Sequence, residues 1–70
     1  MYAFEKLVRK ADQTRHFTIR PIQEGWELCE EENSRVVRQT HYRDWHRVER
    51  ARRALVQEVS TLRENGWQEA

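Results

Sequence analysis

The sequence predicts an α+β fold: a short N-terminal helix, a three-stranded antiparallel β-meander and a long C-terminal amphipathic helix packed on one sheet face. Two segments in the middle of the chain alternate apolar and polar residues, and short turn sequences flank them. Nearer the C-terminus, apolar residues recur at helical spacing. Because the sheet and the helix each have one apolar side, we expect these sides to pack together in one small domain over residues 1–70.

The N-terminal segment 2–13 carries apolar residues at the spacing of one helical face. These residues are Phe4, Leu7, Val8 and Ala11. A helix this short is only marginally stable alone, so we expect it to pack on the rest of the domain. The alternative is an extended first strand.

Three strands are predicted over residues 15–22, 26–32 and 34–42, with turns at "QEG" and "ENS" between them. In the first two strands, the apolar positions that we expect to face the helix are Phe17, Ile19, Trp26 and Leu28. The opposite face then carries a mixed polar set, namely His16, Thr18, Arg20, Glu27 and Cys29. That face is either a binding or dimer surface or the solvated side of an antiparallel sheet. The pattern leaves the register of the third strand open.

The C-terminal helix is predicted from an apolar stripe that is roughly 140° wide on a helical wheel. The stripe consists of Trp45, Val48, Ala51, Leu55, Val56, Val59 and Leu62. Thr40 is the expected N-cap, and Asp44 near the first turn suits the helix dipole. We expect the helix to end near Gly66, with Trp67 folding back onto Leu62 in a Schellman-type cap.

The face of this helix opposite the apolar stripe is basic. We call it the arginine ridge, and it consists of Arg43, His46, Arg47, Arg50 and Arg53. Guanidinium groups spaced along a surface bind phosphates, and each can donate two hydrogen bonds in parallel. The alternative is a solvated face whose charges pair locally, as Glu49 and Arg53 can at i, i+4 spacing.

Charge is segregated along the chain. Residues 21–34 carry five acids and no base, whereas residues 35–53 carry seven arginines and two acids. Such a chain either pairs its acidic and basic segments or presents one of them to a partner. The acids concerned in the second predicted strand are Glu27, Glu30, Glu31 and Glu32. If they neutralise the arginine ridge, the solvated-face interpretation is favoured.

Several classes of protein are disfavoured by the sequence. Cys29 is the only cysteine, so no disulfide can form within the chain, and a lone thiol fits a reducing cytoplasm. Without a C-x-x-C or H-x-x-x-H pattern, we predict no metal ligands, no cofactor and no catalytic residues. No apolar stretch approaches the roughly 20 residues that span a bilayer, and no signal-peptide pattern is present. We therefore expect a small bacterial-type cytoplasmic protein that is not an enzyme.

The predicted order of one helix, three strands and one helix resembles the layout of the double-stranded-RNA-binding domain. "HFTIRPI" would stand for the first strand of that family and "HRVERARRALVQEVSTL" for its second helix. The helix opens with "YRDWHRVER" in place of a lysine-rich cluster, and the strand "SRVVRQTHY" has no glycine, so no RNA-contacting residue is carried over. The three strands and the last helix are also similar in outline to integrase arm-type DNA-binding domains, which read DNA with the sheet. The acidic middle strand of this chain opposes such a use.

We expect a non-enzymatic protein-interaction module whose partner is another protein or a second copy of this chain, because the core of a 70-residue chain is thin. The alternative is a protein that binds DNA or RNA through the arginine ridge. Under that alternative the site residues are Arg43, His46, Arg47, Arg50 and Arg53.

Overall fold

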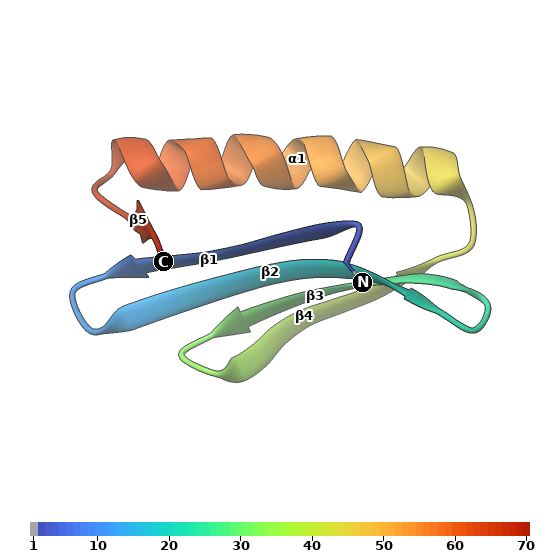
Figure 1. Cartoon of the computed structure of the whole chain (residues 1–70), viewed down its shortest axis with the longest axis horizontal. Helices are drawn as coiled ribbons and strands as arrows, with labels where there is room; N and C mark the ends of the chain where they lie inside the picture. The colour runs from blue at the N-terminus through green and yellow to red at the C-terminus, as the bar shows by residue number, and fades with distance from the viewer. Residues whose placement is uncertain (1) are drawn as a thin grey trace.

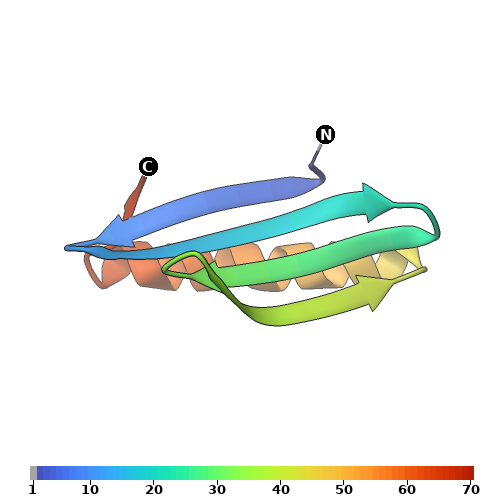
Figure 2. The same ribbon diagram turned by 90° about the horizontal axis from the view of Figure 1, so that it is seen from below.

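A single antiparallel sheet with one long helix lying along one of its faces makes up the fold (Figure 1). The computed structural model describes residues 2–70. The elements in chain order are β1 (Phe4–Lys10), β2 (Gln13–Ile22), β3 (Gly25–Glu32), β4 (Arg35–Tyr42), α1 (Trp45–Glu64) and β5 (Gln68–Glu69). Seen from below, the strands lie in the order β4-β3-β2-β1-β5 with α1 behind them (Figure 2). The α+β class is therefore confirmed, whereas the predicted element order is not.

The predicted N-terminal helix is wrong, because residues Phe4–Lys10 form strand β1. This strand pairs antiparallel with β2, and Val8 lies opposite Arg15. Phe4 and Val8 are four residues apart, a spacing that places them on one face of either a helix or a strand. Pairing with β2 satisfies the backbone of both strands, and this tertiary gain outweighs the local helical pattern.

The predicted three-stranded meander is also wrong, because the sheet has five strands. Strands β1 to β4 follow one another as neighbours, and β5 adds to the free side of β1 through Val8 and Arg9. The two residues of β5 are too few to leave an alternating pattern in the sequence. Their position depends on where the chain turns after α1.

The predicted helix end is confirmed, and the predicted start is not. The Gly66 N–H donates to the Arg63 carbonyl at 3.1 Å and the Trp67 N–H donates to the Leu62 carbonyl at 3.0 Å, which is the Schellman pattern. Thr40 belongs to β4, and Asp44 is the N-cap because its carboxylate accepts from the His46 N–H.

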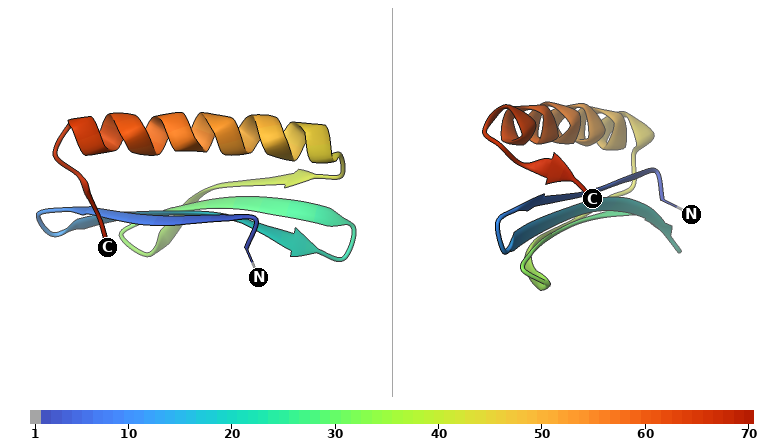
Figure 3. Two further views of the ribbon diagram at one scale, coloured as in Figure 1. Left: turned by 45° about the horizontal axis from the view of Figure 1, so that its top comes forward. Right: turned by 60° about the vertical axis from the view of Figure 1, so that its left-hand side comes forward.

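The core lies between the helix and the sheet. Figure 3 shows α1 lying over one face of the sheet. Its buried residues are Phe4, Val8, Phe17, Ile19 and Leu28 from the strands and Val48, Leu55 and Val59 from α1. The predicted inward positions of the first two strands are confirmed, since Phe17, Ile19 and Leu28 are buried in the core and Trp26 packs against it. Two members of the predicted stripe differ, because Trp45 and Val56 are exposed. Both lie at the margin of the stripe, where a side chain is only partly covered by the sheet.

The third predicted strand is β4, the last strand on one side of the sheet. Its pairing with β3 is interrupted by an irregularity between Glu30 and Glu31. Val36 and Val37 lie beside this irregularity and are exposed. Within residues 2–70, no helix is both long enough and apolar enough to cross a membrane.

Candidate nucleic-acid interface

The arginine ridge lies on the solvent side of the first half of α1. Arg43 precedes the N-cap, and His46, Arg47, Arg50 and Arg53 follow it, and all five residues are exposed. The buried residues of the helix, Val48, Leu55 and Val59, hold its opposite side against the sheet. Helical spacing relates His46, Arg47, Arg50 and Arg53 to one another on α1, whereas Arg43 lies before the extended N-cap residue Asp44 and is not part of the helix.

The position of the ridge opposes what helix stability favours. The N-terminal end of a helix carries a partial positive charge, which acidic side chains stabilise. The first turn of α1 contains no acidic side chain, and Asp44 at the N-cap is the nearest one before it. Arg47 lies in this first turn, where its charge adds to the positive potential of the helix end, whereas Arg50 and Arg53 lie beyond the turn in which this effect acts.

The ridge is only weakly neutralised by nearby acids. Arg43 lies 3.4 Å from Glu24, and Arg53 lies 4.0 Å from Glu49. These are surface pairs between exposed arginines and acids, and such pairs contribute about 0–1 kcal/mol. Among residues 2–70, neither Arg47 nor Arg50 has an acidic partner within ion-pair distance. The centre of the ridge is therefore free to bind an external anion.

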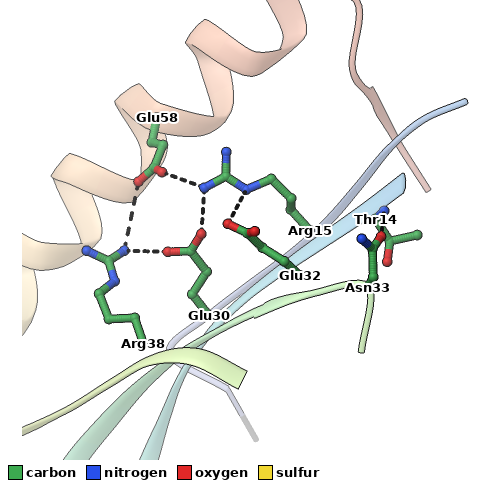
Figure 4. Close-up of polar contacts among 7 residues, drawn as sticks. All are labelled: Thr14, Arg15, Glu30, Glu32, Asn33, Arg38 and Glu58. Atoms are coloured by element: carbon green, nitrogen blue, oxygen red, sulfur yellow. Dashed lines mark hydrogen bonds and ion pairs between the residues drawn. The ribbon is translucent and has the colours of Figure 1, made fainter. Parts of the chain in front are cut away.

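On the helix side of the sheet, the acids of β3 are held by a closed network of ion pairs (Figure 4). Glu30 accepts from Arg15 and lies 3.2 Å from Arg38. Glu58 of α1 joins the same two arginines at 3.0 Å and 3.9 Å. Glu32 lies 3.8 Å from Arg15. These contacts occupy Glu30 and Glu32 with cations of β2 and β4.

On the opposite side of the sheet, Glu27 is held by three side chains. Arg20 and Gln39 donate to its carboxylate at 2.9 Å and 2.7 Å, and His41 Nε2 lies 3.0 Å from it. The hydrogen bonds from His41 and Arg20 lower the pKa of Glu27. The remaining acid of β3, Glu31, lies 3.9 Å from His16. The acidic strand therefore pairs within the sheet and does not neutralise the arginine ridge.

The predicted polar sheet face is confirmed as a surface that α1 leaves uncovered. Its residues line a shallow depression of about 320 Å³, which includes His16, Thr18, Arg20, Glu27 and Cys29. Burial, followed by the charges of Glu31 and Glu27, raises the pKa of the Cys29 thiol. A thiol of this kind is poorly nucleophilic at neutral pH. Within residues 2–70, no group of three histidine, cysteine or acidic side chains is arranged to hold a metal ion.

Two features of the surface were not predicted from the sequence. The apolar pattern predicts Trp45 in the core, but its side chain is 44% exposed at the start of α1. A groove of about 730 Å³ lies between α1 and strands β1 and β5, lined in part by Phe4, Val56 and Trp67. The groove depends on β1, which the sequence pattern predicts as a helix over residues 2–13.

No protein-family model, curated protein or solved structure matches this chain. The geometry of the chain itself is therefore the basis for any functional proposal.

Proposed function

We propose that this chain is a non-enzymatic binding module that holds the phosphate backbone of a nucleic acid on the arginine ridge. One observation supports this proposal above the others: the acids of β3 contact arginine and histidine side chains of the sheet, while Arg47 and Arg50 face solvent without an acidic partner among residues 2–70. Arginine suits this role because its planar guanidinium matches the geometry of a phosphate group.

The length of the ridge matches several phosphates. From Arg47 to Arg53 the helix rises about 9 Å, which is close to the axial rise of two or three nucleotides of one strand, and Arg43 extends the ridge before the N-cap. If each of the four arginines contacts one phosphate of a duplex, the logarithm of affinity falls with the logarithm of salt at a slope of about −3.6. A rise from about 50 to 200 mM salt then weakens binding roughly a hundredfold.

The test is a fluorescence-anisotropy titration with a labelled duplex and a labelled single strand at those two salt concentrations. Arg47→Ala/Arg50→Ala should weaken binding of both probes and reduce the duplex salt slope by about 1.8, because two phosphate contacts are lost. The matched control is Arg9→Ala/Arg35→Ala, which removes the same charge from exposed positions on the sheet. Equal losses in the two double variants, or an unchanged slope in the ridge variant, would refute the proposal.

A second candidate function is protein interaction, and the specific observation that favours it is the edge strand β4. This strand is eight residues long, ends the sheet and carries the exposed residues Val36 and Val37. Such an edge can pair with another strand. We take a second copy of this chain as the partner, so light scattering should give the mass of a dimer. Val36→Lys/Val37→Lys should then give a monomer, and a wild-type monomer at micromolar concentration would exclude this candidate.

The single free thiol of Cys29 suits a reducing compartment, so we assign this activity to the cytoplasm. Both candidates are binding functions, and neither requires a cofactor.

A further inference from the structure

Trp45 is the exposed tryptophan of the chain, and it begins the helix that carries the arginine ridge. It is 44% exposed, whereas Trp26 and Trp67 are partly buried against the core. A tryptophan side chain exposes a large apolar area when it is left in water. An indole exposed beside basic side chains can pack against a ligand that carries both phosphate groups and a flat apolar surface.

The indole ring of Trp45 is held in one orientation. Its ring centroid lies 5.2 Å from that of Trp26, with the planes tilted by 56°. Its Nε1–H donates to Glu49 Oε1 at 2.9 Å. Because these two contacts already order the side chain, a ligand that stacks on it loses little additional conformational freedom on binding.

The held ring lies at the margin of the apolar stripe and borders the ridge on the side of Arg53. Trp45, Glu49 and Arg53 follow one another at i, i+4 spacing, and the last two form an ion pair at 4.0 Å. Arg43 precedes the ring by two residues and is exposed. A strand whose phosphates contact Arg43 and Arg53 can therefore bring a base to the indole.

We propose that Trp45 stacks on an unpaired base, so that the arginine ridge prefers single-stranded over double-stranded nucleic acid. This inference rests on the proposed function. Base–aromatic stacking is tolerant of sequence because every base has a π face, and it is a common feature of single-strand binding. In a duplex the bases are already stacked and paired, so the phosphates reach the ridge but the bases do not reach the ring.

The experiment compares a labelled 20-nucleotide oligo(dT) with a labelled 20-base-pair duplex at one salt concentration. Wild type should bind the single strand more tightly. Trp45→Leu keeps an apolar group over Trp26 but removes the stacking surface. It should weaken oligo(dT) binding by roughly ten- to a hundredfold, the loss that follows from one base stack, and change duplex binding by less than about twofold. Trp45→Phe keeps a ring and should retain most of the affinity for oligo(dT).

The matched control is Tyr2→Leu, which removes another exposed aromatic side chain, one that borders the depression on the opposite face of the sheet. It should leave both affinities unchanged. A second measurement does not depend on the folding of Trp45→Leu. In Trp26→Phe/Trp67→Phe, the fluorescence of Trp45 alone should be quenched by oligo(dT) and not by the duplex.

The results separate this inference from the proposed function. If Trp45→Leu leaves oligo(dT) binding unchanged or weakens both probes equally, the stacking inference is overturned while the ridge is kept. If Trp45 fluorescence is quenched equally by both probes, the preference for single strands is overturned. If wild type binds neither probe at about 50 mM salt, the proposed function fails and the inference fails with it.

Discussion

Glu30 is the most buried member of the ion-pair network between the sheet and α1, and neutralising it tests how that network stabilises the fold. Its side chain is 7% exposed, and it pairs with Arg15 and with Arg38, whose side chains are 20% and 46% exposed. Glu30→Gln keeps the shape of the side chain and removes its charge. The variant therefore places an amide where Arg15 and Arg38 now meet a carboxylate.

The size of the effect follows from these exposures. A hydrogen bond to a charged group in a shielded position contributes about 1.5–3 kcal/mol, which applies to the contact with Arg15. The contact with Arg38 is close to half exposed and contributes less than about 1 kcal/mol. We expect Glu30→Gln to lower the free energy of unfolding by about 2–3 kcal/mol. For a domain of this size that loss lowers Tm by about 10–20 °C.

The assay is urea and thermal unfolding followed by circular dichroism. Glu58→Gln is the matched control, because Glu58 joins the same two arginines but its side chain is 37% exposed. It should cost less than about 1 kcal/mol. An unchanged Tm for Glu30→Gln, or a larger loss for Glu58→Gln than for Glu30→Gln, would show that burial does not set the strength of this network.

Three further predictions concern the turn, the core and the polar sheet face. Gly25→Ala should lower the free energy of unfolding by at least about 2 kcal/mol in urea titrations, because φ is 140° there and the added Cβ would lie 2.1 Å from the Tyr42 carbonyl oxygen. Leu55→Ala should lower it by about 2–5 kcal/mol, since Leu55 is fully buried and its loss leaves a cavity. Because the pKa of Glu27 is lowered, its carboxylate stabilises the fold above the ordinary glutamate pKa of about 4.3, and this contribution is lost as pH falls through the lower folded value. Glu27→Gln should therefore reduce the loss of Tm between neutral pH and that acid range.

Each of these changes has a control on the same molecule. Gly66→Ala also acts at a positive φ, but its added Cβ would lie 3.6 Å from the flexible Lys10 side chain, so its cost should be smaller than that of Gly25→Ala. Val56→Ala removes an exposed side chain and should change stability by less than about 1 kcal/mol. Glu24→Gln, at an exposed position, should leave the acid dependence of Tm unchanged.

The sequence by itself determined the elements whose signals are local. The C-terminal helix repeats its apolar positions over several turns, and Gly66 with Trp67 marks its end. The alternating segments in β2 and β3 also predict correctly which side of each strand packs against α1. These patterns depend only on the fixed geometry of a helix or a strand, so the sequence is enough to predict which side of each element is apolar.

The first and last strands were decided by tertiary contacts. Phe4 and Val8 fit one face of a helix as well as one face of a strand, and pairing with β2 selected the strand. Strand β5 exists because the cap at Gly66 directs the chain back to β1, where Gln68 meets Arg9. Neither outcome can be read from a local pattern, because each depends on a partner that lies far away along the chain.

The candidate interface also has one part that the sequence predicts and one part that depends on tertiary contacts. Helical spacing alone put Arg47 and Arg50 on one face, because side chains three and four residues apart lie on the same side of a helix. Whether that face would be neutralised depended on the register between strands and on the crossing of α1 over the sheet. That register places Glu30 between Arg15 and Arg38, and the helix brings Glu58 to the same two arginines. Pairing of charges across strands is a long-range property, so only the tertiary structure could decide it.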